Sequence, residues 1–276
     1  MEVLTSRKNP YIQHLRELAK DACSRRAAGE FICDSPKLLE EALLCGAELT
    51  SVLWRKGKQE NGGRNYCADS GDSSAICGAA LPDDLRFAEG VREYMAEEEL
   101  FAYASPMVNS PGPVFTVRIK EPDTDTPIGN AIVLENVQDP GNIGTVIRTA
   151  NAFGIGAVIL TGECADLYSP KTVRSTMGAL FRQRVIRTDN EHLLPLLKKH
   201  GLPLYGAVLS DRAKSILAAD LSGGCAVAVG NEGRGLSGEL RQLCEGELII
   251  PMEPGTESLN AAVAAAVIMW EMRGRT

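Results

Sequence analysis

The segment AIVLENVQDPGNIGTVIRTANAFGIGAVIL (131–160) decides the fold class of this 276-residue chain. Two short apolar runs, 131–135 and 157–160, enclose a stretch that opens with Asp139 and Pro140 and continues with apolar residues at helical spacing. The apolar runs do not alternate with polar residues, which is typical of strands buried on both faces of a parallel sheet. The segment therefore predicts a strand, a helix and a second, parallel strand.

The same pattern continues towards the end of the chain. Further short apolar runs lie at 184–186, 204–209, 225–230 and 247–251. Together with the first two runs they predict a mostly parallel sheet, so we expect residues 128–276 to form one α/β domain. The apolar segment 261–270 is about half as long as a membrane-spanning helix, and we expect it to be a buried helix.

The N-terminal part of the chain shows a shorter α/β alternation. We expect helices over 6–20, over 35–44 and near the acidic residues 89–98, and strands at 31–33 and 51–54. Five prolines between residues 104 and 127 leave room for only one strand, at 114–119. A domain boundary is therefore expected near 105–113. The predicted parts are a first domain at 1–105, a linker with its strand at 106–127, and the C-terminal domain at 128–276.

Composition indicates an ordinary globular protein. The apolar fraction of 44% and the charged fraction of 24% exclude a collagenous or disordered chain. The first residues contain no apolar core followed by small residues, so we expect no export signal and a cytoplasmic location. The eight cysteines form no C-x-x-C pair, which argues against a zinc site and for reduced thiols. A polar, glycine-rich surface loop is expected at 59–74, and Cys67 and Cys77 flank a polar stretch at a spacing that leaves a disulfide open.

Charge is unevenly distributed along the chain. The net charge of −7 argues against indiscriminate binding to nucleic acid, and acidic residues concentrate at 83–99. Five basic residues lie within 17 residues that contain no acidic side chain, namely Lys171, Arg174, Arg182, Arg184 and Arg187. Contacts with RNA phosphates and a solvated surface explain this cluster about equally well.

Three stretches that mix glycine or proline with polar residues follow the ends of predicted strands. They lie at 136–154, 226–237 and 249–266. Parallel sheets bind ligands at the carboxyl ends of their strands, and glycine allows backbone to approach a ligand closely. Taken singly, the residues have simpler explanations: helix capping for Asp139, Ser258 and Asn260, and a solvated side chain for Arg148 and Glu232.

The second stretch excludes two common nucleotide sites. Its glycines, at 230, 233 and 235, have the spacing G-x-x-G-x-G, which is neither the dinucleotide fingerprint nor the phosphate loop of nucleotide triphosphatases. A nucleotide-binding oxidoreductase on an open sheet therefore lacks its main sequence signal.

In their order and spacing, the three stretches resemble the SpoU (TrmH-like) family of RNA ribose methyltransferases, within the SPOUT superfamily. The residues at the family's motif positions are Asn142, Arg148, Glu232, Ser258, Leu259 and Asn260. The segment 169–181 matches a further family stretch, and 31–43 looks like the small α/β, L30e-like substrate-binding domain that often precedes the catalytic domain. Asp34 and Ser35 stand where relatives more often show glutamate and glycine, which concerns the RNA target rather than the chemistry.

The resemblance implies a C-terminal sheet with a deep trefoil knot. It implies transfer of a methyl group from S-adenosylmethionine to a ribose 2′-hydroxyl of RNA, with ribosomal RNA favoured over transfer RNA. It also implies a homodimer whose second subunit completes the site, and neither a metal nor a membrane partner. The implied catalytic residues are Asn142, Arg148, Glu232, Ser258 and Asn260. The implied cofactor-binding residues are Leu209, Gly230, Ile250, Met252 and Leu259, and the candidate RNA-binding residues are Lys171, Arg174, Arg182 and Arg184.

The implied roles follow the chemistry of each side chain. Asn142 and Asn260 are expected to orient the ribose and its phosphate, and Glu232 and Ser258 to position Arg148. The family assigns the arginine that matches Arg148 as general base, but a guanidinium normally stays protonated. We therefore expect Arg148 to stabilise the developing alkoxide or to fix a phosphate, with the proton lost to water or to a transiently neutral arginine. A catalytically silent RNA-binding protein of the same fold is the alternative, and the intact polar residues argue against it.

Overall fold

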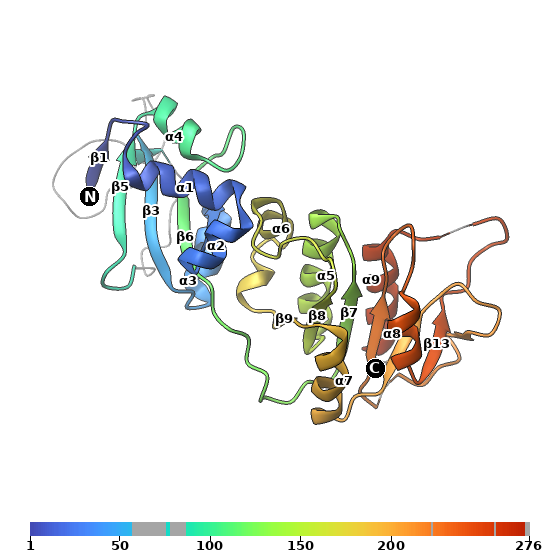
Figure 1. Cartoon of the computed structure of the whole chain (residues 1–276). Helices are drawn as coiled ribbons and strands as arrows, with labels where there is room; N and C mark the ends of the chain where they lie inside the picture. The colour runs from blue at the N-terminus through green and yellow to red at the C-terminus, as the bar shows by residue number, and fades with distance from the viewer. Residues whose placement is uncertain (57–75, 78–86, 222, 257, 274–276) are drawn as a thin grey trace. The chain divides into compact units, whose positions relative to one another are not determined.

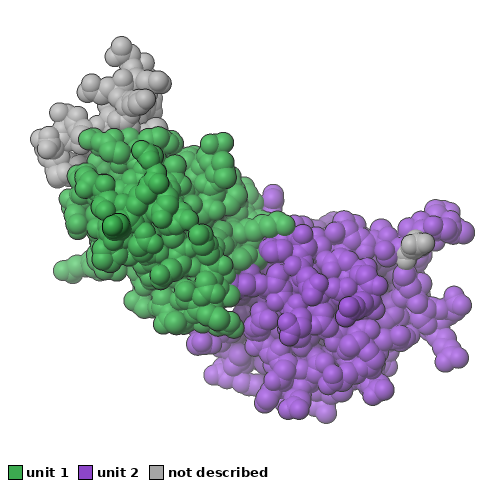
Figure 2. All heavy atoms as spheres, turned by 45° about the horizontal axis from the view of Figure 1, so that its top comes forward, with its two compact units in different colours: residues 1–120, 168–181 green, residues 121–167, 182–276 purple. Residues whose placement is uncertain are grey.

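The chain forms two compact units in a computed structural model, which describes residues 1–56, 76–77, 87–221, 223–256 and 258–273. Unit 1 consists of Met1–Lys120 with Tyr168–Phe181, and unit 2 of Glu121–Leu167 with Arg182–Thr276 (Figure 2). The predicted loop at 59–74, Cys67 and the side chain of Cys77 lie outside the described residues. Each unit has its own sheet and core (Figure 1).

Unit 1 contains a six-stranded mixed sheet in the order β1-β5-β3-β6-β2, with β4 paired to β3. Its strands are β1 (Glu2–Leu4), β2 (Glu30–Asp34), β3 (Leu49–Lys56), β4 (Ile76–Cys77), β5 (Arg92–Ala96) and β6 (Val114–Arg118). Its helices are α1 (Pro10–Lys20), α2 (Ala22–Ala28), α3 (Pro36–Leu44), α4 (Glu98–Ala104) and α6 (Pro170–Ser175), with a 3-10 turn at Ala179–Phe181. Ile32 packs in a core with α1 and α4, whereas Phe31 and Cys33 pack in a second core with α3 and Val173 of α6. Since neighbouring strand residues face opposite sides, these helices cover both faces of the sheet.

Two expectations for unit 1 need correction. The acidic helix predicted near 89–98 is wrong: β5 occupies Arg92–Ala96, and α4 begins only at Glu98. Parallel pairing of β5 with both β1 and β3 overrides the local pattern, and Glu98 and Glu99 instead fill the first turn of α4, where acidic side chains are favoured. The division between the units falls after Lys120 rather than near 105–113, because β6 pairs with β2 and β3.

Unit 2 contains a seven-stranded sheet in the order β11-β13-β10-β12-β7-β8-β9, and every pair of neighbours is parallel. The strands are β7 (Ala131–Glu135), β8 (Ala157–Thr161), β9 (Val185–Arg187), β10 (Leu204–Ala207), β11 (Lys214–Ser215), β12 (Ala226–Val229) and β13 (Gly246–Ile249). All six strands expected from apolar runs are present, which confirms the α/β class and the mostly parallel sheet. Only β11 was not expected, since two residues are too short to give a pattern.

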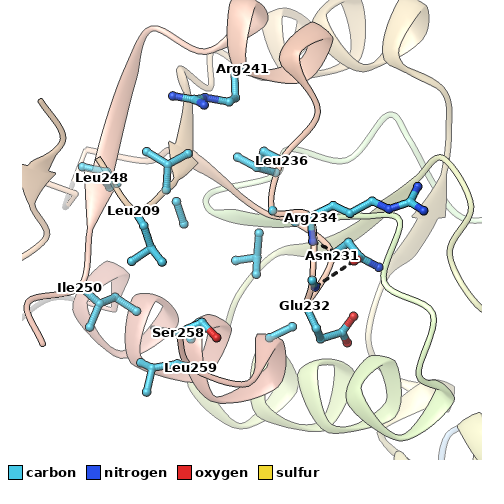
Figure 3. A pocket seen from close by; sticks show the side chains of 18 of the residues that line it. Leu209, Asn231, Glu232, Arg234, Leu236, Arg241, Leu248, Ile250, Ser258 and Leu259 are labelled. Carbon is cyan, nitrogen blue, oxygen red and sulfur yellow. Dashed lines mark hydrogen bonds between the residues drawn. The ribbon is translucent and has the colours of Figure 1, made fainter. Parts of the chain in front are cut away.

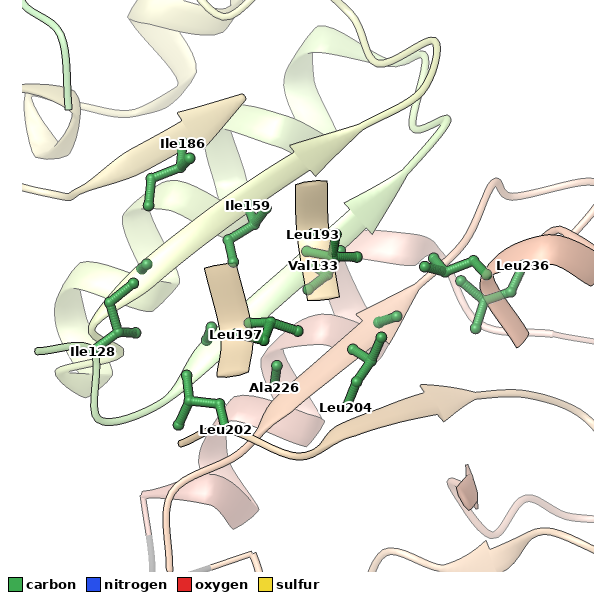
Figure 4. Packing of buried hydrophobic residues seen from close by; sticks show 14 residues of the cluster. Ile128, Val133, Ile159, Ile186, Leu193, Leu197, Leu202, Leu204, Ala226 and Leu236 are labelled. Atoms are coloured by element: carbon green, nitrogen blue, oxygen red, sulfur yellow. The ribbon is translucent and has the colours of Figure 1, made fainter. Parts of the chain in front are cut away.

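Helices cover both faces of this sheet. They are α5 (Pro140–Phe153), α7 (Asn190–Lys199), α8 (Gly238–Leu243) and α9 (Ala261–Met272). Val133 and Ile159 pack with Leu193 and Leu197 of α7 in one buried cluster (Figure 4). Residues of the alternate register, such as Leu134, are also fully buried and face the side on which α5 and α9 pack together.

The expectation that the helix near the C-terminus is buried holds for one side only. Ala262, Ala265 and Met269 of α9 are buried, but the side chains of Val263 and Trp270 are 49% and 56% exposed. Among the described residues, no helix combines the length and the apolar character that crossing a membrane requires.

Candidate active site

A pocket of about 560 Å³ opens where β10, β12 and β13 end (Figure 3). Its lining comes from the ends of these strands and the segments that follow them, within 207–209, 229–236 and 248–252, from residues within 258–264 at the start of α9, and from Arg241 of α8. Parallel strands present their carboxyl ends at one edge of a sheet, so stretches far apart in sequence meet there. The second and third polar stretches predicted from sequence therefore share one cavity.

All five residues expected to bind the cofactor line this pocket. They are Leu209, Gly230, Ile250, Met252 and Leu259. Leu209 is an apolar side chain that is 60% exposed at the pocket, where a bound molecule would cover it. The structure thus brings the five residues together, and their contact with a cofactor stays a prediction.

Gly230 has a second, structural reason to be glycine. A Cβ atom at this position would overlap with the carbonyl carbon of Gly235 and the amide nitrogen of Leu236. The backbone of 231–235 folds back on itself, since Asn231 and Gly235 exchange two backbone hydrogen bonds of 3.1 and 2.9 Å. Only glycine permits this close approach of two backbone segments.

The side chain of Asn231 fixes the same turn, and sequence reasoning gave it no role. Its Oδ1 accepts hydrogen bonds from the backbone N–H groups of Gly233 at 2.9 Å and Arg234 at 3.2 Å. Its Nδ2 donates to the carbonyl of Asn136, at the end of β7, at 2.9 Å. The signal was an asparagine at the start of a glycine-rich turn, where such side chains bond backbone two or three residues ahead.

Three of the predicted catalytic residues form a hydrogen-bonded chain at the pocket. Asn142 Nδ2 donates to Glu232 Oε1 at 2.7 Å, and Asn260 Nδ2 donates to Asn142 Oδ1 at 3.1 Å. We call Asn142, Glu232 and Asn260 the polar cluster. Each member comes from a different one of the three polar stretches, so the structure joins all three stretches in one place.

Helix capping and membership of the cluster coexist in Asn260. Its Oδ1 accepts hydrogen bonds from the N–H groups of Ala262 at 2.9 Å and Val263 at 3.3 Å, which caps α9, while its Nδ2 faces Asn142. Asp139 caps α5 in the same way and so fixes the turn that carries Asn142. The simple capping explanation was therefore correct for Asn260 without excluding a place in the site.

The remaining two predicted catalytic residues differ in position. Ser258 lines the pocket beside Leu259. Arg148 does not line it: the side chain is exposed on α5, six residues after Asn142. Six residues move a side chain about 9 Å along a helix and onto another face. The side chain of Arg148 makes no hydrogen bond or ion pair with any described residue.

Glu135, at the end of β7, holds the segment that follows the glycine-rich turn in place, and the sequence analysis did not identify it. Its side chain is 1% exposed, and its two carboxylate oxygens accept hydrogen bonds from the N–H of Ser237 at 2.7 Å and the hydroxyl of Ser237 at 2.6 Å. The Ser237 hydroxyl in turn caps α8 by accepting from Leu240 N at 3.1 Å. Glu135 therefore anchors the end of the 231–237 segment to β7, and the signal was a carboxylate closing an apolar run.

Two cysteines of unit 2 are unsuited to nucleophilic chemistry. Burial raises the pKa of the Cys244 thiol to about 11, and the carboxylates of Glu247 and Glu135 add to this effect. Burial alone raises the pKa of Cys225 to about 11. Both are protonated thiols at neutral pH. Within the described parts of the chain, no three potential metal ligands come together.

The basic residues considered for RNA binding are divided between the two units. Lys171 and Arg174 belong to unit 1, whereas Arg182 and Arg184 belong to unit 2. Arg174 Nη1 lies 3.6 Å from Asp34 Oδ2, and Arg184 Nη1 donates to the carbonyl of Thr126 at 2.7 Å. All four have interactions within the chain, so their binding to RNA stays a prediction.

The chain is similar over its full length to known RNA methyltransferases. The profile of the SpoU rRNA Methylase family matches residues 129–270. A protein of Synechocystis sp. that is named an uncharacterized tRNA/rRNA methyltransferase is 32% identical over 279 residues, which cover 98% of this chain and 93% of the relative. The 23S rRNA (guanosine(2553)-2′-O)-methyltransferase RlmP of Bacillus subtilis is 30% identical, covering 99% of this chain and 100% of RlmP. The crystal structure of an rRNA methyltransferase from Sinorhizobium meliloti with bound S-adenosylmethionine has a TM-score of 0.82 at 25% identity, covering 99% and 97% of the two chains.

Proposed function

This chain belongs to the SpoU rRNA methylase family, and from this premise we propose that it transfers a methyl group from S-adenosylmethionine to a ribose 2′-hydroxyl of ribosomal RNA. Relatives that match nearly its whole length support this activity, since one is named a 23S rRNA 2′-O-methyltransferase and another was solved with S-adenosylmethionine. The observation that carries the proposal is the polar cluster, Asn142, Glu232 and Asn260, at a pocket edged by three strand ends.

The pocket fits S-adenosylmethionine in size and chemistry. A volume of about 560 Å³ lies in the ordinary range for pockets that hold a small molecule. Leu209, Ile250 and Leu259 supply an apolar lining, and the turn at 230–235 supplies backbone polar groups for specificity. When bound, S-adenosylmethionine supplies an electrophilic methyl group on a sulfonium.

The polar cluster is suited to hold a sugar. Asn142 and Asn260 each use one N–H of the side-chain amide within the cluster and keep a second for substrate, and Glu232 keeps its Oε2 as an acceptor. These groups match a ribose hydroxyl and its neighbouring phosphate. Holding the hydroxyl in a fixed position is the main contribution that we expect from them.

We further propose that the protein is a homodimer whose second copy completes the site. On α9, Val263, Val267 and Trp270 recur at the spacing of one helix face, yet two of them are about half exposed. A helix that is apolar all round is normally covered on every side. We expect a second copy to cover this face and to bring Arg148 to the polar cluster of the other subunit, where its guanidinium would stabilise the alkoxide or bind a phosphate. Sedimentation equilibrium is expected to give twice the mass of the chain.

Three other features of the family stay predictions for this chain. We expect the deep trefoil knot, and the tight approach of Gly230 to residues 235 and 236 is compatible with it. We propose that the N-terminal domain, expected at 1–105, binds the RNA substrate. A cytoplasmic location is also expected. Transfer RNA is the second candidate substrate, because the Synechocystis relative is named a tRNA/rRNA methyltransferase.

Asn260→Ser and Asn260→Ala separate the two tasks of Asn260 and test the proposal. Purified protein is incubated with S-adenosylmethionine labelled in the methyl group and with ribosomal or transfer RNA from cells that lack the protein, and 2′-O-methyl sites are mapped. Serine keeps the helix cap, so Asn260→Ser is expected to unfold like the wild type yet methylate about 100-fold more slowly, since the amide contact with Asn142 is lost.

The controls decide between the alternatives. Asn260→Ala is expected to lose the cap as well, at about 1 kcal/mol of unfolding free energy. Wild-type protein that binds RNA and S-adenosylmethionine but transfers no methyl group would point to a silent RNA-binding protein. Methylation of a base, or of transfer RNA alone, would contradict the proposed product or substrate.

A further inference from the structure

Arg234 is a cation at the rim of the pocket without a partner among the described residues. Two basic residues line the pocket, Arg234 and Arg241. Arg241 is neutralised, since its Nε donates to Glu247 Oε1 at 3.0 Å. Arg234 is exposed and makes no side-chain hydrogen bond or ion pair with any described residue. It is therefore the uncompensated positive charge of the pocket lining that the structure describes.

The backbone of Arg234 is held rigidly although its side chain is free. Its N–H donates to Asn231 Oδ1 at 3.2 Å, and the turn is closed on either side by the two backbone hydrogen bonds between Asn231 and Gly235. Asn231 is itself bonded to the carbonyl of Asn136. A cation on a fixed backbone loses less conformational freedom on binding an anion than one on a mobile loop.

The direction of the side chain separates it from the apolar part of the pocket. Arg234 leaves the turn away from Leu209 and Ile250 and on the same side of the pocket as Glu232 (Figure 3). Glu232 is the residue of this turn that belongs to the polar cluster. The guanidinium therefore lies outside the apolar lining, on the side of the turn from which Glu232 also projects.

We propose that Arg234 binds a phosphate of the RNA strand next to the ribose that the polar cluster receives. This inference rests on the proposed function. In RNA every 2′-hydroxyl lies beside the phosphate on the neighbouring 3′-oxygen, and the planar guanidinium fork matches two phosphate oxygens. A chain of net charge −7 needs local cations to hold RNA, the more so because the Glu232 carboxylate lies two residues away.

The carboxylate of S-adenosylmethionine is another anion that a guanidinium could hold. The position of Arg234 outside the apolar lining favours the phosphate. The two ligands give different kinetic results, because a phosphate contact changes the KM for RNA and a carboxylate contact changes the KM for S-adenosylmethionine.

Arg234→Gln and Arg234→Lys test the inference with ribosomal RNA from cells that lack the protein. For Arg234→Gln we expect the KM for RNA to rise about 10-fold, with kcat and the KM for S-adenosylmethionine within about 2-fold of wild type. Arg234→Lys keeps the charge without the fork and is expected to raise the KM for RNA about 3-fold. RNA binding, measured by filter retention across a salt series, is expected to lose about one unit of salt slope in Arg234→Gln.

Lys198→Gln is the matched control, since Lys198 is an exposed cation on α7, which contributes nothing to the pocket lining. It is expected to keep the wild-type KM and salt slope. An unchanged KM for RNA in Arg234→Gln, or a rise confined to the KM for S-adenosylmethionine, overturns the inference while methylation by the wild type upholds the proposed function. If the wild type methylates nothing, the proposed function fails, and the salt slope still decides whether Arg234 contacts phosphate.

Discussion

The tripeptide Ser-Pro-Lys starts two helices of unit 1, yet the backbone enters these helices in two different ways. Ser35 caps α3 by accepting a hydrogen bond from Leu38 N at 3.3 Å, and Ser169 caps α6 by accepting from Thr172 N at 3.2 Å. Ser169 has φ −63° and ψ 144°, an ordinary extended conformation, whereas Ser35 has φ 105° and ψ 148°. The same three residues predict the same helix start and the same cap, but not the path of the chain into it.

The difference arises from what precedes each serine. Ser35 directly follows the last residue of β2, and its N–H donates to the carbonyl of Pro113 at 3.1 Å, so the chain must turn from strand to helix within one residue. Ser169 follows a loop and has room for an ordinary approach. The conformation of Ser35 lies in a region that residues other than glycine adopt only at a cost of about 1–3 kcal/mol. Tertiary structure, rather than local sequence, therefore imposes the strain.

An ion pair joins the residue before Ser35 to the last turn of α6. Asp34, immediately before Ser35, has a side chain that is 4% exposed, and its Oδ2 has no hydrogen bond among the described residues. Arg174, in α6, places Nη1 at 3.6 Å from this oxygen and is 46% exposed. Asp34 thus keeps a buried carboxylate whose charge is balanced from the other Ser-Pro-Lys helix.

The largest expected effect comes from cutting this link. Arg174→Gln leaves the buried carboxylate without its counter-charge and is expected to lower the free energy of unfolding by about 2 kcal/mol, less than for a fully buried pair because water reaches Arg174. Urea unfolding measures the change. In an Asp34→Asn background the same substitution is expected to cost under about 0.5 kcal/mol, and equal costs in both backgrounds would show that Asp34 and Arg174 are not coupled.

Arg212→Gln is the control for loss of a surface arginine. Arg212 is exposed in unit 2, and its side chain makes no ion pair or hydrogen bond with any described residue. Its replacement is expected to change the free energy of unfolding by under about 0.5 kcal/mol.

A smaller effect of opposite sign is expected from Ser35→Gly. Glycine adopts the conformation of Ser35 without strain and retains most of the value of a capping residue, so the variant is expected to gain about 1 kcal/mol of unfolding free energy. The matched variant Ser169→Gly relieves no strain and is expected to lose a few tenths of a kcal/mol, about 0.3. Equal losses in both variants would mean that the two serines sit in equivalent conformations.

The contrast between these serines also describes how far the sequence determined the fold. Apolar runs predicted every strand of the parallel sheet except β11, and capping residues predicted the starts of α3 and α5. These features depend on neighbours within one turn or one strand. The strand β5 was mistaken for a helix because its pairing partners, β1 and β3, are distant in sequence.

At the candidate site, too, local sequence patterns were recognisable, whereas contacts between residues distant in sequence were not. Asn142, Glu232 and Asn260, which the resemblance assigned to one site, are joined by hydrogen bonds, and their catalytic roles stay predictions. Glu135 and Asn231 were missed because their roles consist of bonds to Ser237 and Asn136, which no local pattern reveals. Helix starts that follow strand ends are recognisable in sequence, whereas the supports that hold them in place are not.

The smallest expected effect is a pH dependence that distinguishes Asp34 from an ordinary capping aspartate. Burial raises the pKa of Asp34 above its usual 3.8, and this outweighs the hydrogen bond from Ser110 and the attraction of Arg174, which lower it. Because the pKa of Asp34 is raised, the folded state takes up the proton before the unfolded state as the pH falls. Asp34 therefore contributes to the unfolding free energy at acidic pH, and this contribution is lost as the pH rises through the raised pKa. Asp34→Asn removes this pH-dependent contribution to the unfolding free energy.

The measurement is the difference in unfolding free energy between wild type and Asp34→Asn at several pH values between neutral and about pH 4, near the reference pKa of aspartate. The unfolding free energy of the wild type is expected to rise relative to that of Asp34→Asn as the pH falls. Asp189, which caps α7, gives the opposite case once the pH is below the pKa of His192, which Asp189 raises. Hydrogen bonds from His192 lower the pKa of Asp189, so in this acidic range the stabilising contribution of Asp189 is lost as the pH falls, and the unfolding free energy of the wild type should drop relative to that of Asp189→Asn. Difference curves of the same sign for the two aspartates would show that Asp34 is not held in its buried, charge-balanced position beside Ser35.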